Sequence, residues 1–188
     1  MIESRRRLIC ISIFHTQEDM GSLGKRLPAS EDYREGAHAF WVEIQRQVQA
    51  LALNWSGVRI YQDGLPDAPS EIVQKILNEV RSPNYDLLRW LIAQGAEVIG
   101  TESPALIKEE YMLLAAVHTA KNARVKAKAR RDYAARAGEL LAERDSYIAR
   151  RIADTLPLGS AGLLLIGHAH DVAKYLPSEI AIEWLCHG

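Results

Sequence analysis

Residues 163–170 consist of the apolar run Leu163-Leu164-Leu165-Ile166, followed directly by Gly167-His168-Ala169-His170. An apolar run without polar alternation is typical of a strand buried on both faces of a parallel sheet. A second run of this kind extends from Leu8 to Phe14 and leads into His15-Thr16. Shorter strands are predicted over residues 58–61, closed by Asp63-Gly64, over residues 97–99 and over residues 180–182.

Helical patterns fill the intervals between these strands. Apolar residues recur at helical spacing over residues 37–55, Ser70 is a predicted N-cap, and Ser82-Pro83 begins a helix that Gly95 ends. From Pro104 to Leu156 there is one glycine and no further proline, which predicts two long helices joined around residues 121–131. We expect a single α/β domain over residues 1–188, with a mostly parallel sheet in a layered α/β sandwich. Residues 104–156 would form a long helical insertion that partly projects.

Composition and charge narrow the class of protein. The chain has 188 residues, of which 48% are hydrophobic and 25% charged, with a formal net charge of -1. This balance gives no overall attraction to nucleic acid or to an anionic membrane. Its two cysteines, Cys10 and Cys186, imply no disulfide framework. No segment approaches the roughly 20 apolar residues of a membrane helix, and the short run after Arg5-Arg6-Arg7 does not fit a signal peptide, so we expect a cytoplasmic protein without a membrane partner.

A basic run lies within the predicted helical insertion. It holds six positive charges in eleven residues, at Lys121, Arg124, Lys126, Lys128, Arg130 and Arg131. No aromatic residue interrupts it before Tyr133, whereas proteins that bind single strands stack bases on aromatic side chains. The sequence therefore favours a solvated helix connection over a nucleic-acid partner. A homodimer contact along the long helices is also expected.

Histidines follow two of the predicted strands and a glutamate follows a third. In parallel sheets, ligands bind beyond the carboxyl ends of the strands, where His15, Glu102, His168 and His170 would meet. Two histidines separated by one residue in an extended chain point to the same side, so His168 and His170 could share a divalent ion with His15. The alternative is that one histidine packs and the other bonds a loop carbonyl.

Glu102 and Arg144 are the other candidate site residues. Glu102 precedes Ser103-Pro104, where it either favours the start of a helix electrostatically or serves as a metal ligand or general base. Arg144 lies within an apolar helical stripe, between Leu141 and Ile148. A buried guanidinium needs a partner, so Arg144 either forms a structural ion pair, for example with Glu102, or binds a substrate anion.

Several of these motifs together resemble a known superfamily. They are Gly100-Thr101-Glu102, the helical pair Glu143-Arg144, and the strand from Leu163 to His170 with the segment that follows it. The resemblance is to the superfamily of the TraB, TIKI, erythromycin-esterase-like and ChaN haem-binding proteins, over roughly the C-terminal half. It implies one cleft lined by Glu102, Glu143, Arg144, His168 and His170. It also implies either hydrolysis of peptides or esters, in some members with a divalent metal, or haem binding.

The leading hypothesis is a metal-assisted hydrolase of ester or peptide bonds in a small molecule or peptide. A divalent ion on His15, His168 and His170 would activate water, with Glu102, Glu143 and Arg144 as catalytic residues. One alternative is a non-catalytic protein that binds haem or a small anion in the same cleft. Another is a dimeric regulatory module.

Overall fold

A computed structural model describes residues 5–16, 18–19 and 31–185 of the chain. Its centre is a five-stranded sheet of order β3-β2-β4-β1-β5, in which all neighbouring strands are parallel. The strand bounds are Arg6–Ile13 for β1, Arg59–Gln62 for β2, Glu97–Ile99 for β3, Ala161–Gly167 for β4 and Ile180–Trp184 for β5. The predicted α/β class and parallel sheet are confirmed, and each of the five predicted strands is present.

Helices connect the strands along the chain. Their bounds are Glu31–Ala50 for α2, Ser70–Glu79 for α3, Pro83–Ala93 for α4, Pro104–His118 for α5 and Ala123–Thr155 for α6, with short 3-10 helices at Trp55–Gly57 (η1) and Val172–Tyr175 (η2). The helix predicted over residues 37–55 begins earlier and ends at Ala50. Trp55 lies beyond its end, in η1, where the indole packs edge-on against Trp90 of α4, with ring centroids 5.9 Å apart.

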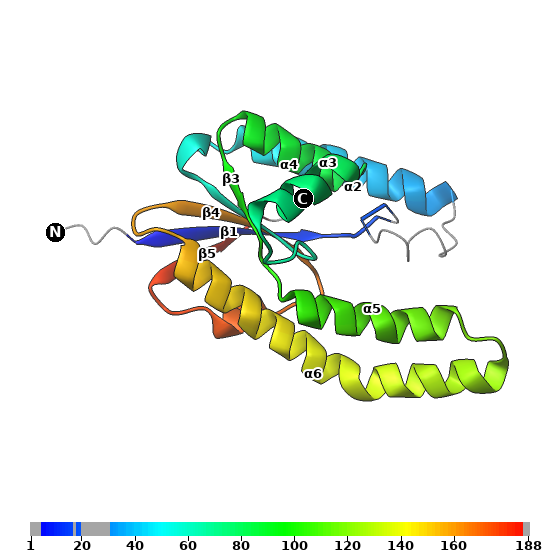
Figure 1. Ribbon diagram of the computed structural model, residues 1–188. Coiled ribbons are helices and arrows are strands. Elements are labelled where there is room, and N and C mark those ends of the chain that lie inside the picture. The colour runs from blue at the N-terminus through cyan, green and yellow to red at the C-terminus, as the bar shows by residue number, and fades with distance from the viewer. Residues whose placement is uncertain (1–4, 17, 20–30, 186–188) are drawn as a thin grey trace.

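The sheet is the middle layer of a three-layer sandwich. Alternate residues of β1 point to opposite faces. Ile9, Ile11 and Ile13 pack with α2, α3 and α4, whereas Leu8 and Cys10 pack with the C-terminal half of α6. Figure 1 shows α2, α3 and α4 on one side of the sheet and α5 and α6 on the other. Burial on both faces explains the uninterrupted apolar run of β4 and the nearly continuous one of β1, which only Ser12 interrupts between Leu8 and Ile13.

The α5–α6 hairpin extends beyond the sheet, as the sequence predicts (Figure 1). Its connection is shorter than predicted, because α6 already begins at Ala123. Asn122 caps this end, since its side-chain oxygen accepts a hydrogen bond of 2.9 Å from the amide of Val125. The joint expected across residues 121–131 is therefore mostly helix, in keeping with the high helix propensity of its alanine, lysine and arginine residues.

The structure bears on the cysteines and on the absence of a predicted membrane helix. Cys10 is a buried free thiol, and burial raises its pKa to about 12, which disfavours the reactive thiolate. Cys186 lies outside the described residues. In the part of the chain that the structure describes, no helix has both the length and the apolar character needed to cross a bilayer.

Candidate functional site

A pocket of about 630 Å³ lies at the carboxyl ends of the strands. One side is formed by residues that directly follow β1, β2 and β4, and the other by α5 and α6. Its charged and imidazole side chains are His15, Asp19, Asp63, Glu110, Arg144, His168 and His170. The position agrees with the rule that open parallel sheets bind ligands beyond their strand ends, and the volume is that of a small-molecule site.

Asp63 is the centre of the polar cluster. It follows β2, and its side chain is only 3% exposed. Oδ2 accepts hydrogen bonds from His15 Nε2 at 2.8 Å and from the Gly167 amide at 2.9 Å, while Oδ1 accepts from Arg144 Nη2 at 2.9 Å. His170 Nε2 lies 3.4 Å from the same Oδ2. Two imidazoles from different strand ends thus converge on one buried carboxylate oxygen.

The other ring nitrogen of His170, Nδ1, contacts a second buried carboxylate, that of Asp145. This nitrogen lies 2.5 Å from Asp145 Oδ1, and Asp145 Oδ2 accepts the amide of Asp171 at 2.8 Å. Asp145 comes from α6, next to Arg144. A carboxylate on Nδ1 favours the imidazole tautomer with its proton on that nitrogen, while Nε2 faces Asp63 Oδ2.

Arg144 forms hydrogen bonds to three carboxylates next to these two histidines. It donates to Glu102 through Nε and Nη2, each at 2.6 Å, and to Glu110 through Nη1 at 2.6 Å, in addition to Asp63. The structural ion pair with Glu102 that the sequence suggested is present. All three guanidinium nitrogens are therefore engaged by carboxylates, so Arg144 is a positioning residue at this site.

The cluster shifts the pKa values of its members in different directions. Burial raises the pKa of Glu102 to about 7, and the nearby Asp63 adds to this, whereas Arg144 acts against it. Burial alone would raise the pKa of Asp63, but the hydrogen bond and charge of His15 outweigh burial and hold it well below its usual range. As the pH falls, Glu102 therefore takes up a proton while Asp63 keeps the negative charge.

The two histidines have raised pKa values. Burial acts to lower the pKa of His15, but the hydrogen bond to Asp63 and its charge reverse that effect. For His170, burial again acts to lower the pKa, and the hydrogen bond to Asp145 together with the charge of Asp63 reverses it. Both imidazoles therefore hold a proton to higher pH than an unperturbed histidine does.

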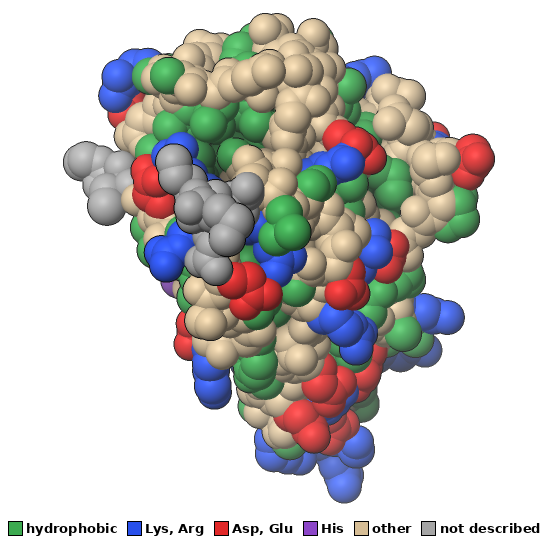
Figure 2. All heavy atoms as spheres, turned by 90° about the vertical axis from the view of Figure 1, so that its left-hand side faces the viewer, with side chains coloured by type: hydrophobic (Ala, Val, Ile, Leu, Met, Phe, Trp, Pro, Cys, Tyr) green, Lys and Arg blue, Asp and Glu red, His purple; other side chains and the backbone are tan. Residues whose placement is uncertain are grey.

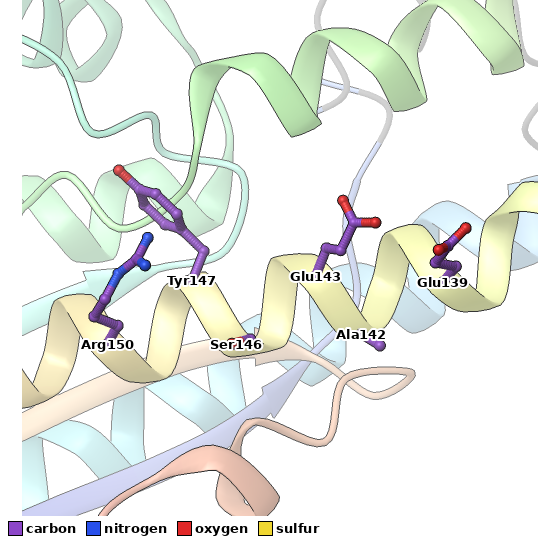
Figure 3. Close-up of a pocket in the computed structure, with 6 residues that line it drawn as sticks. All are labelled: Glu139, Ala142, Glu143, Ser146, Tyr147 and Arg150. Atoms are coloured by element: carbon purple, nitrogen blue, oxygen red, sulfur yellow. The ribbon is translucent and has the colours of Figure 1, made fainter.

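The sequence-predicted residues divide between this cluster and other places. His15 and His170 meet at Asp63 and line the pocket. Glu102 lies beneath Arg144, fully buried, and also accepts the Gly64 amide at 2.7 Å. Glu143 is exposed and pairs with Arg136 at 2.8 Å. It lines a separate hollow of about 360 Å³ along α6 (Figure 3).

His168 lies apart from His170, although only one residue separates them. The segment is a turn, in which the His170 amide donates to the Gly167 carbonyl at 3.1 Å, and not the extended chain that the sequence predicted. His168 is exposed and faces Phe14, with ring centroids 6.3 Å apart. The two imidazoles therefore have different surroundings, one in the buried cluster and the other at the pocket surface.

The donors do not form a metal-ligand set as they are placed. A structural or catalytic zinc needs at least three donors around one point, at about 2.0–2.3 Å from the ion. His15 Nε2 lies 2.8 Å from Asp63 Oδ2, a direct hydrogen-bond distance that leaves no space for an ion between them. Within the described ranges, no group of three or more His, Cys, Asp or Glu side chains is arranged to hold one. Metal binding at His15, His168 and His170 stays a prediction.

Asp63, Asp145 and Glu110 are site residues that the sequence did not single out. Asp63 precedes Gly64, and this pair of residues by itself indicates only a turn that closes β2. The position of Asp63 just after a predicted strand, like that of His15, is the sequence feature that points to it as a site residue. Asp145 follows Arg144 directly, and its buried position opposite His170 depends on how α6 packs on the sheet.

Comparison with known protein families, characterised proteins and solved structures finds no match for this chain. The fold and the site by themselves define an α/β protein with a histidine–carboxylate cluster at the carboxyl edge of a parallel sheet.

Proposed function

We propose that the chain is a hydrolase of ester or peptide bonds, with His15, His170 and Asp63 as its proton-transfer centre. The convergence of two imidazoles on one buried carboxylate oxygen, inside a pocket of small-molecule size, is the observation that supports the proposal. Hydrolysis needs a base that takes a proton from water and an acid that returns one to the leaving group. Two histidines with raised pKa values can supply both.

His170 is the better oriented base. In its neutral form the proton stays on Nδ1 beside Asp145, and Nε2 is left to accept a proton from water as the water oxygen attacks the carbonyl carbon. Protonated His15, stabilised by Asp63, supplies the proton that the leaving alcohol or amine takes up as its bond to the carbonyl carbon breaks. Arg144 maintains the positions of Asp63 and Glu102.

The substrate pocket is apolar opposite this centre. Ile107 and Leu114 of α5 and Tyr133 and Leu141 of α6 face it, together with Phe14. The polar cluster itself carries more carboxylates than cations, which disfavours an anionic substrate group close to Asp63. A neutral ester or amide with an apolar substituent fits this combination.

The test is a panel of fluorogenic esters and short peptides, measured with the wild type and with His15→Ala and His170→Ala. Loss of a general acid or base should lower kcat/KM by about 100-fold or more on any substrate that is turned over. His118→Ala is the matched control, because His118 is exposed on α5 outside the pocket. Equal activity in all variants, or no turnover of any substrate, would contradict the proposal.

A second candidate function is haem binding, and it rests on His168. This imidazole is exposed in a pocket that also contains Phe14, Tyr111 and Tyr133, which is the combination of an iron ligand and flat apolar surface that haem requires. Titration with haemin should then give a Soret band that His168→Ala removes. The same band in His168→Ala would exclude this residue as the ligand.

A further inference from the structure

The tip of the α5–α6 hairpin carries an unbroken block of positive charge. Residues 119–131 contain six lysines and arginines and no acidic residue. All six are exposed at the end of the hairpin that points away from the sheet (Figure 1). The opposite end of the molecule, seen in Figure 2, has acidic and basic side chains interspersed. A chain with a net charge of -1 thus concentrates its positive charge at one projecting tip.

The positive charges of this block destabilise the first turns of α6. A helix N-terminus is stabilised by acidic residues and destabilised by cations, yet the first turn of α6 has no acidic residue and contains Arg124 and Lys126. Arg124 with Lys128 and Lys126 with Arg130 are also like-charged pairs four residues apart, each of which costs roughly 0.2–0.5 kcal/mol. Packing and capping therefore do not account for the positive charges.

Ion pairing changes sharply along α6. From Asp132 onward, most arginines of α6 are paired: Arg136 with Glu109 and Glu143, Arg144 with Glu102, and Arg151 with Asp67. Within the tip, Lys128 pairs with Asp132 at 2.6 Å. Among the described residues, no ion pair involves Lys121, Arg124, Lys126, Arg130 or Arg131. Five guanidinium or ammonium groups of the tip therefore remain available to an anionic partner.

The cations form two rows along the first turns of α6. With 3.6 residues per turn, Arg124, Lys128 and Arg131 lie along one flank, and Lys126 and Arg130 lie along the other. The crest between the rows consists of Ala123, Ala127 and Ala134, all exposed, and it faces away from the side on which Ala129 is buried. At the tip, α6 therefore presents a small-residue crest with a positive row on each side, while α5 runs alongside α6 (Figure 1).

We propose that this tip binds duplex DNA, with the first turns of α6 lying in the major groove and each positive row contacting one phosphate strand. A major groove about 12 Å wide admits one α-helix, whose diameter is about 10–12 Å with side chains and less along an alanine crest. The alanines offer no hydrogen-bonding group to the base edges, so binding depends on the phosphates and is independent of sequence.

Other anionic surfaces fit this tip less well. Single strands are held by aromatic stacking, and the tip has no aromatic residue. A bilayer surface would require bulky apolar residues along the crest, where alanines stand. The deep, narrow major groove of duplex RNA does not admit a helix. The absence of aromatic residues therefore disfavours single strands and has no bearing on duplex DNA.

The experiment measures fluorescence anisotropy of a labelled DNA duplex of about 20 base pairs at salt concentrations from about 50 to 200 mM. The variant carries Arg124→Ala, Lys126→Ala, Arg130→Ala and Arg131→Ala, which keep the helix because alanine has the highest helix propensity. We expect about tenfold or greater weakening and a salt slope lower by roughly 3 to 4, since each phosphate contact contributes about 0.9.

The control removes the same charge elsewhere, through Lys75→Ala, Arg81→Ala, Lys108→Ala and Lys174→Ala, all at exposed positions. It should bind like the wild type, and unrelated duplex sequences should bind within about threefold of one another. Equal weakening in both variants would overturn the proposal. So would equal binding of a single strand or an RNA duplex of the same length, or binding only to vesicles that contain phosphatidylserine.

Discussion

Arg144 donates two hydrogen bonds of 2.6 Å to the carboxylate of Glu102, one from Nε and one from Nη2. Both side chains are buried, and the pair joins α6 to the segment between β3 and α5. Because a buried charge without a partner is costly, this contact couples the position of α6 on the sheet to the geometry of the site.

Removing the guanidinium should destabilise the chain strongly. Arg144→Met keeps the apolar stem and leaves Glu102, Asp63 and Glu110 without their shared cation, for an expected loss of about 3–5 kcal/mol in the free energy of unfolding. Arg150→Met, at an exposed position on the same helix, should cost less than about 1 kcal/mol. Urea unfolding at pH 7 measures both, and equal losses would show that the buried ion network does not stabilise the fold.

Glu102 should make stability depend on pH. Its pKa is about 7 in the folded chain against an ordinary value of 4.5, so the folded state binds this proton more tightly. The resulting stabilisation is complete below about pH 4.5 and is lost as the pH rises through about 7. Relative to Glu102→Gln, the wild type should lose up to about 3 kcal/mol over that window. Glu139→Gln on the outer side of α6 is the matched control, and parallel stability curves for wild type and Glu102→Gln would refute the raised pKa.

Gly167 allows the site residues to converge. A Cβ atom at this position would lie 2.9 Å from Asp63 Oδ2 and 3.5 Å from His15 Nε2. Gly167→Ala should therefore displace the carboxylate and cost about 1–3 kcal/mol, with a loss of activity as well. Gly138→Ala meets no atom within 4 Å and should stabilise α6 by about 0.5–1 kcal/mol. Thermal melting compares the two, and an unchanged Gly167→Ala would mean that Asp63 does not occupy the position described.

The role of a metal is testable separately. Since His15 and His170 are hydrogen-bonded to carboxylates, we expect hydrolysis to survive dialysis against a chelator. Loss of activity that zinc or manganese restores, with a melting-temperature increase in the wild type and none in His170→Ala, would instead support the sequence-based prediction of a metal-assisted enzyme. Elemental analysis of the purified protein is the direct complement.

The fold was largely predictable from the sequence, and the site only in part. β1 and β4 are recognisable because strands buried on both faces consist mainly of consecutive apolar residues, with Ser12 as the one exception between Leu8 and Ile13. His15, Glu102, Arg144 and His170 were identified from strand ends and from a charge within an apolar stripe. Asp145 was not, because its contact with His170 joins residues 25 apart and depends on the rotation of α6 over the sheet. The turn that separates His168 from His170 likewise has no signal in a histidine–alanine–histidine pattern.

The pH dependence of kcat/KM in the wild type and in Asp63→Asn tests the proton-transfer centre most directly. The charge of Asp63 raises the pKa values of both histidines, and a neutral amide removes that effect. In Asp63→Asn we expect kcat/KM to fall and the histidine limb of the pH profile to move to lower pH. Asp145→Asn is a second variant with the same expectation, for use if Asp63→Asn does not fold. A profile unchanged in position in the folded variant would contradict the assignment of His15, His170 and Asp63 as one centre.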